Sequence, residues 1–149
     1  MAVDSVEVAL AEGGLAHEVT SAGAHLRIGA PAPAVTHDPT RGLQVRLDDG
    51  WCWCRTEPVG PTPTVLVPGA VVRPAASTTV LVVVEPDGSC FLVVVEGEVE
   101  IDRPAGTTVR SGGSLVDLAA DGRFQADQAS ASEIAADPLV STNRALDGR

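Results

Sequence analysis

Two tryptophans and two cysteines alternate in the segment GWCWCRT, residues 50–56. Thiolates bind metal ions and undergo redox chemistry, so Cys52 and Cys54 are the first candidates for a reactive site. In an extended strand, residues two apart point to the same side at a spacing of about 7 Å, which is too far for a disulfide and unfavourable for chelation. The alternation therefore predicts a β-strand with the cysteines on one face and Trp51 and Trp53 on the other.

The third cysteine, Cys90, and the histidines His17, His25 and His37 are the other residues that could complete a metal site. Each histidine stands alone in the sequence, so we expect surface or capping roles for them, with no metal site and no cofactor. The thiols are then small apolar fillers of a core, with a metal site or redox sensing as the alternatives. Which face of the strand is buried stays open, and an exposed tryptophan pair would be an interaction site.

No sequence motif of an enzyme is present. The chain contains no Gly-x-Ser-x-Gly motif, no phosphate-binding loop and no dinucleotide-binding fingerprint. Asp49 and Gly50 are predicted to form the turn of a hairpin. Glu96, Glu98 and Glu100 are predicted to share one face of a strand, as a solvated face, a calcium site or a docking strip for a basic partner. We therefore expect a protein that is not an enzyme.

The composition favours one domain with an aliphatic core. Hydrophobic residues make up 44% of the 149 positions, whereas aromatic residues make up 3%. The formal net charge of −10 disfavours binding to nucleic acid and to anionic membranes, which attract clustered positive charge. The apolar runs 80–84 and 91–95 are too short to span a bilayer, and the acidic N-terminal sequence is not a signal peptide. With an odd number of cysteines, these features predict a cytoplasmic protein.

Alternating apolar residues predict that most of the chain is β-strand. Half-buried strands are predicted at 5–10, 24–28 and 43–47. The valine-rich runs 78–85 and 90–96 predict strands buried on both faces, joined by a tight turn. Shorter strands are predicted at 98–101, 107–110 and 114–118, and Pro-rich loops at 30–40 and 57–63.

The sequence divides into an all-β domain, residues 1–126, and an Ala-rich segment, residues 127–149, that is helical or flexible. Within this second segment a short helix is predicted, with Ser130 or Ser132 as its N-cap and Glu133 in its first turn.

A second C-terminal helix is predicted to follow Asp137, because Pro138 suits the first position of a helix. Its apolar contacts would come from Leu139, Val140 and Leu146. The segment is then either a packed terminus or a docking segment for a partner or for a second copy of the chain. The candidate interaction or thiol site consists of Trp51, Cys52, Trp53, Cys54, Leu139, Val140 and Leu146.

Three segments carry a resemblance to a known family: VRLDDGWCWC (45–54), TVLVPGAVV (64–72) and the long strand-and-turn run 77–122. Together they resemble a FecR-type domain, named for the ferric-citrate regulator. EGEVEI, at 96–101, stands for the Glu-Gly-x-Val-x-Val hairpin of the family, and Gly112 and Gly113 stand near its late glycine. The Gly-Thr-x-Phe element of the family is replaced by STTV here. The resemblance implies a β-helical or sandwich-like all-β domain for sensing or scaffolding, without enzyme activity and without the transmembrane signalling of the family.

These observations predict a non-catalytic regulatory or scaffold module that contacts another protein or itself as a homo-oligomer. The alternative is a cupin-like or cyclic-nucleotide-domain-like barrel that binds a small molecule, to which residues 91–118 are weakly similar. The His-x-His pair of a cupin metal site is absent, as is the Gly-Glu of a cyclic-nucleotide phosphate cassette, although Arg123 lies nearby.

Overall fold

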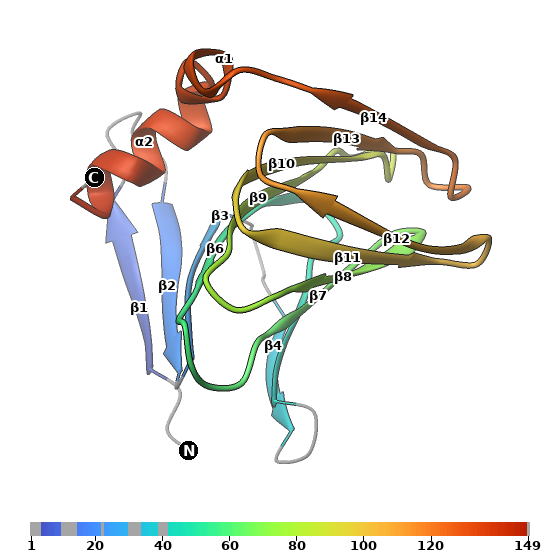
Figure 1. Ribbon diagram of the computed structural model, residues 1–149. Helices are drawn as coiled ribbons and strands as arrows, with labels where there is room; N and C mark the ends of the chain where they lie inside the picture. Colours follow the sequence, from blue (N-terminus) through green and yellow to red (C-terminus); the bar gives the residue numbers. More distant parts are fainter. Residues whose placement is uncertain (1–3, 10–14, 22, 30–33, 39–41, 149) are drawn as a thin grey trace.

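The computed structural model describes residues 4–9, 15–21, 23–29, 34–38 and 42–148. They form two β-sheets packed face to face, followed by two short helices (Figure 1). The predicted fold class, an all-β domain with a short helical C-terminal segment, is confirmed. Of the two architectures that the resemblance implied, the strands adopt the sandwich.

The larger sheet has eight strands. In spatial order they are β1 (Asp4–Ala9), β2 (Leu15–Ser21), β3 (Ala24–Gly29), β6 (Gly50–Thr56), β9 (Thr79–Val84), β10 (Cys90–Glu96), β13 (Ser114–Leu118) and β14 (Phe124–Gln128). The smaller sheet has six strands, in the order β12 (Gly106–Ser111), β11 (Glu98–Arg103), β8 (Ala70–Pro74), β7 (Thr64–Val67), β5 (Gly42–Arg46) and β4 (Ala34–Asp38). Among these strands, only β5 and β7 pair in parallel. The described strands form two open sheets, so the barrel of the small-molecule alternative is not formed by them.

The core lies between the two sheets and is almost entirely aliphatic. Strand β9 contributes Val80 and Val82 to it, and its outward residue Leu81 is also fully buried. The prediction of a strand buried on both faces is therefore confirmed for β9. Each such side chain stabilises the fold by roughly 1.5–3 kcal/mol when it leaves water.

The Asp49-Gly50 segment is a crossing between the sheets, which makes the hairpin prediction wrong. Strand β5 pairs with β4 and β7 in the smaller sheet, whereas β6 pairs with β3 and β9 in the larger one. The inward residues of both strands still meet in one core, from opposite sides. Period-two alternation indicates that one face of a strand is buried, but it does not indicate to which sheet the strand belongs, so two successive strands with a turn between them need not form a hairpin.

The prediction that Glu96, Glu98 and Glu100 share one strand face is wrong for Glu96 and correct for Glu98 and Glu100, which are both exposed at alternate positions of β11. Glu96 ends β10 in the larger sheet, and Glu98 begins β11 in the smaller one. The change of sheet occurs at Gly97, whose φ of 84° lies in the left-handed region that favours glycine. Thr79 Oγ1 donates to Glu96 Oε1 (3.0 Å), which holds this carboxylate on the larger sheet.

Several strands were not predicted. The alternation pattern did not indicate strands β2, β7 and β8. Strand β4 falls in the segment 30–40, for which the sequence predicts a Pro-rich loop, and β14 extends to Gln128, beyond residue 126, where the strand pattern ends. The Pro-rich loop expected at 57–63 contains no strand, as predicted. Prolines bias a segment away from ladder pairing, but they do not prevent a short edge strand such as β4 between them.

Gly97→Ala tests the sheet crossing. A Cβ at residue 97 would lie 2.6 Å from Thr78 Cα, whereas a Cβ at Gly122, whose φ is also positive at 90°, meets nothing within 4 Å. We expect Gly122→Ala to lower the free energy of unfolding by about 1 kcal/mol through backbone strain alone. Gly97→Ala should cost about 3 kcal/mol, because steric overlap adds to the strain. Urea denaturation measures both, and equal losses would contradict a tightly packed crossing.

Candidate functional site: the aromatic face and the C-terminal tail

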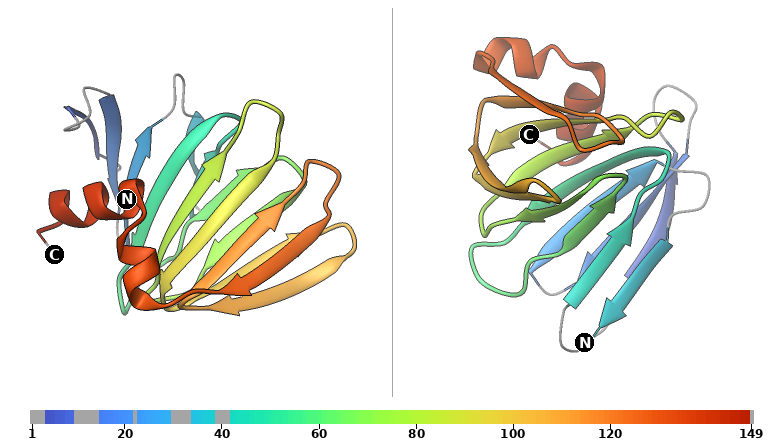
Figure 2. Two further views of the ribbon diagram at one scale, coloured as in Figure 1. Left: turned by 90° about the horizontal axis from the view of Figure 1, so that it is seen from above. Right: turned by 90° about the vertical axis from the view of Figure 1, so that its right-hand side faces the viewer.

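The outer face of the larger sheet is covered by the C-terminal tail, residues 129–148. Figures 1 and 2 show α1 (Ala131–Ala135) and α2 (Pro138–Leu146) on the side of this sheet that faces away from the smaller sheet. Strands β6, β9, β10 and β13 present an apolar surface there, called the aromatic face below: Trp51, Trp53, Leu81, Val83, Phe91, Val93, Val95 and Leu115.

The tail is helical because its caps are encoded locally. Ser130 Oγ accepts a hydrogen bond from the Glu133 N–H, and Glu133 Oε1 accepts one from the Ser130 N–H, each at 3.2 Å, which is a capping box. Asp137 Oδ1 accepts from the N–H groups of Leu139 (2.9 Å) and Val140 (3.2 Å) at the start of α2. Both predicted helices and their caps are confirmed.

A small apolar contact joins the tail to the aromatic face. Ile134 and Val140 are buried in one cluster with Trp53, Leu81 and Val93, and Leu139 packs against its margin. Leu146 is 41% exposed and does not take part. The structure thus brings together four of the seven candidate site residues, Trp51, Trp53, Leu139 and Val140, at one interface.

The two cysteines of the candidate site point the other way. Cys52, Cys54 and Cys90 are buried in the core between the sheets. Burial raises the pKa of both Cys54 and Cys90 from 9.0 to about 12, so these thiols stay protonated near neutral pH. Within the described part of the chain, no three His, Cys, Asp or Glu residues are grouped so that they could hold a metal ion.

The end of the tail is held on the sheet by the carboxylate of Asp147, whose side chain is 0% exposed. Its Oδ2 accepts a hydrogen bond from the indole Nε1 of Trp53 (2.7 Å), and its Oδ1 accepts one from Arg27 Nη2 (3.0 Å). Arg55 Nε lies 3.0 Å from Oδ2 as an ion pair, without the alignment of a hydrogen bond. One carboxylate therefore contacts three side chains of the two adjacent strands β3 and β6.

Asn143, one turn before Asp147, completes this contact. Its Oδ1 and its backbone oxygen accept from Arg27 Nη1 at 3.0 and 3.3 Å, and its own Nδ2 donates to Leu139 O within α2. Arg27 also donates to Glu18 Oε1 from Nε (2.9 Å) and Nη2 (2.6 Å). We call the set Glu18, Arg27, Trp53, Arg55, Asn143 and Asp147 the latch.

The latch fixes the position of α2 more than it stabilises the fold. Arg27 is 2% exposed, and the removal of a guanidinium and a carboxylate from water costs nearly as much as their attraction returns. Such a buried pair is tolerated where its hydrogen bonds are satisfied, and it then rejects arrangements that leave a charge unpaired. These contacts pair specific side chains of the tail with specific side chains of β3 and β6.

Sequence reasoning missed the latch. Arg27 and Arg55 occupy outward positions of their strands, where a charged residue reads as solvent-exposed, and Asp147 reads as a helix C-cap. The contact between Arg27 and Asp147 spans 120 residues, and the register that sets Arg27 opposite Trp53 follows only from the sheet. The one available signal was Arg55, a charged residue on the same strand face as the two tryptophans.

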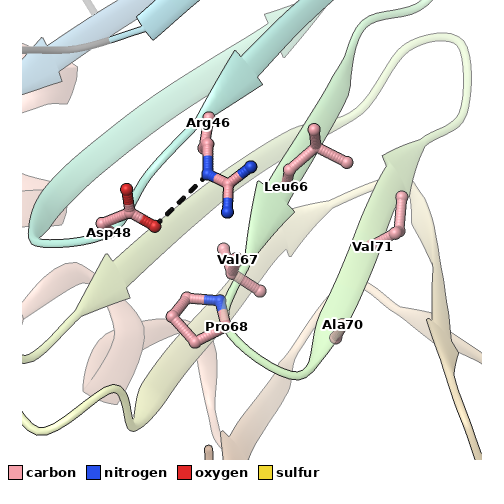
Figure 3. A pocket seen from close by; sticks show the side chains of 7 residues that line it. All are labelled: Arg46, Asp48, Leu66, Val67, Pro68, Ala70 and Val71. Atoms are coloured by element: carbon pink, nitrogen blue, oxygen red, sulfur yellow. Dashed lines mark ion pairs between the residues drawn. The ribbon is translucent and has the colours of Figure 1, made fainter.

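The smaller sheet carries a pocket of about 320 Å³ near the turn between β7 and β8 (Figure 3). Its lining consists of Arg46, Asp48, Leu66, Val67, Pro68, Ala70 and Val71. The Arg46 and Asp48 side chains form an ion pair (3.6 Å), but they are 66% and 73% exposed. Their opposite charges offset each other, and water screens the pair, so it contributes little to stability. A second pocket, of about 480 Å³, lies at the β13–β14 turn and is lined by Asp117, Ala119, Arg123, Phe124 and Gln125. Neither pocket joins a nucleophile to a base.

Comparison with known proteins gives a fold relationship. Two crystal structures described as a "putative anti-sigma factor" from Parabacteroides distasonis ATCC 8503 are similar to this chain, with TM-scores of 0.56 and 0.53 and sequence identities of 18% and 16%. Each similarity covers 88% of this chain but 58% of the other chain, so this protein spans little more than half the length of those neighbours. No family model and no curated protein matches the sequence. At these identities the similarity shows the fold alone.

Among the described residues, no helix is both long enough and apolar enough to cross a membrane.

Thiol chemistry tests the placement of the cysteines. At about pH 8, a thiol-specific reagent should leave all three thiols of the native chain unmodified, because they are buried and protonated, and should modify all three in denaturant. Above pH 9.0 the unfolded thiols ionise while Cys54 and Cys90 remain protonated up to about pH 12. The free energy of unfolding should therefore fall as the pH rises through this window. Rapid modification of native Cys52 and Cys54 would contradict the burial.

Asp147→Ala tests the latch. The substitution leaves Arg27 with Glu18 as its one remaining carboxylate partner and leaves the Trp53 indole N–H without its acceptor. We expect the free energy of unfolding to fall by about 3 kcal/mol. In a Trp51→Phe background, the emission of Trp53 should shift to longer wavelength as the tail leaves the indole. Asp49→Ala removes an exposed carboxylate as the matched control and should change stability by less than about 0.5 kcal/mol. An unchanged Trp53 emission in the Asp147 variant would show that Asp147 does not hold the tail.

Proposed function

We propose that this chain is a non-catalytic regulatory or scaffold module that works by binding a protein segment on its aromatic face. The observation that carries the proposal is the recognition of the tail. The face holds a helix through an apolar contact at Val140 and through the directed contacts of Asp147 with Arg27, Trp53 and Arg55.

The composition of this face supports a role in protein contacts. Tryptophan and arginine are enriched among the residues that dominate protein–protein binding energy, because both combine a large contact area with fixed hydrogen-bond donors. Trp53, Arg27 and Arg55 are neighbours on β3 and β6, and the strand register holds them in place. A preorganised face of this kind binds at a lower entropic cost than a flexible loop.

The structural neighbours support the regulatory part of the proposal. They share the fold over 88% of this chain and are described as anti-sigma factors, a name for a regulatory protein. The remainder of those longer chains has no counterpart in the alignment, so a role on a sigma factor is not part of the proposal. The proposed partner is another protein or a second copy of the chain in the cytoplasm, with no nucleic acid or membrane, in keeping with the net charge of −10.

Capture experiments with full-length variants test the function. Asp147→Ala should release the tail and open the face, so the immobilised variant should retain partner proteins from a cell extract more strongly than wild type. Adding Phe91→Glu to the same variant places a charge on the opened face and should abolish the gain. Asp49→Ala is the control and should behave like wild type.

Support requires all three results together, with circular dichroism confirming that each variant is folded. Equal capture by the wild-type chain, the Asp147 variant and the double variant would overturn the proposal. Stoichiometric metal in the purified protein, measured by elemental analysis, would instead favour a small-molecule or enzymatic function.

A further inference from the structure

The tail is attached to the aromatic face without any strand pairing. In the described residues, α1 and α2 make no backbone–backbone hydrogen bond to a strand, and the contacts across this interface come from side chains such as Ile134, Val140 and Asp147. The tail is joined to the sheet by the short segment Ala129-Ser130, where the Ala129 N–H donates to Gly113 O (2.8 Å). The preceding strand, β14, lies at one edge of the larger sheet, and β1 lies at the other. The tail can therefore leave the face as a unit while both sheets keep their ladders.

Release of the tail would uncover polar groups that water can solvate but that a purely apolar partner would bury without hydrogen bonds. Arg27 would keep only Glu18, and the Trp53 indole N–H would lose its acceptor. Around them lie Leu81 and Val93, which are at most 1% exposed when the tail is in place. An occupant of this face must therefore bring both apolar contacts and a carboxylate.

The positions of Trp53 and Arg27 on the face define which residues an occupant must carry and at what spacing. It needs an apolar residue to meet Trp53, an amide three positions later to meet Arg27, and a carboxylate four positions after that, on one face of a helix. In this chain Val140, Asn143 and Asp147 provide that series. A second copy of the chain carries the same series, attached to its own edge strand.

We propose that the aromatic face accepts the α1–α2 tail of a second copy, so that two chains associate by exchanging their tails. This inference rests on the proposed function and names its partner. Exchange can keep the latch contacts and the apolar contacts of Ile134 and Val140, and it changes the path of the chain at the connection, residues 129 and 130. The balance between the closed monomer and the exchanged dimer is then set by chain concentration and by the difference in conformational free energy of this connection between the two forms.

A labelled tail peptide, residues 129–149, tests the exchange against full-length chains. Fluorescence anisotropy should show that the Asp147→Ala chain binds the peptide roughly tenfold or more tightly than wild type, because the intact tail of wild type competes for the face. The same peptide carrying Asp147→Ala should bind at least about tenfold more weakly, since it cannot meet Arg27 and Trp53. The Asp49→Ala chain should bind like wild type.

The wild-type chain provides a second measurement that does not depend on the stability of the variant. Incubation of the concentrated chain with isotopically labelled copies, followed by native mass spectrometry, should show mixed dimers, and excess tail peptide should suppress them. Absence of peptide binding to both chains, or equal binding of the two peptides, overturns the exchange. If the Asp147 variant nevertheless captures other proteins through the face, the proposed function stands and only its assignment to a second copy fails.

Discussion

The central strands of the larger sheet are apolar on both faces, and the rest of the structure depends on this constraint. The inner face, with Cys52, Cys54, Val80 and Val82, is buried by the smaller sheet. The outer face would expose Trp53 and other large side chains to water unless a further layer covered it. A sandwich of two sheets supplies only one such interface, so the chain needs a second cover, and the tail provides it.

The tail covers this face with few apolar residues and a specific set of polar contacts. A helix with a longer apolar stripe would bind more tightly, but it could also slide along the smooth apolar surface. Asn143 and Asp147 occupy positions where such a helix would carry leucine, and they pair with Arg27 and Trp53. The tail is thus positioned by specific polar contacts as well as by apolar packing.

The sequence predicts this architecture wherever the controlling interactions are local. The alternation in β9, the Pro138 start of α2 and the capping box at Ser130 all depend on residues within a few positions of each other, and all were predicted. The crossing at Gly50 and the latch depend instead on which strands become neighbours. The alternation of a strand does not specify the sheet to which the strand belongs. The residues near Asp147 likewise do not indicate that its partner is Arg27, 120 residues away in the sequence. The alternation also could not show whether the tryptophans or the cysteines of β6 face inward, because both faces are covered: the cysteine face by the smaller sheet and the tryptophan face by the tail.

The hydrogen bond between Trp53 and Asp147 gives the most direct test of this account. ¹⁵N NMR of the full chain resolves the indole N–H signals of its two tryptophans, and Trp51→Phe assigns the signal of Trp53. The account predicts that the Trp53 indole proton exchanges slowly with solvent in the wild-type chain and rapidly in the Asp147→Ala chain. Rapid exchange in wild type, or the same slow exchange in both chains, would contradict the claim that Asp147 holds the tail on the aromatic face.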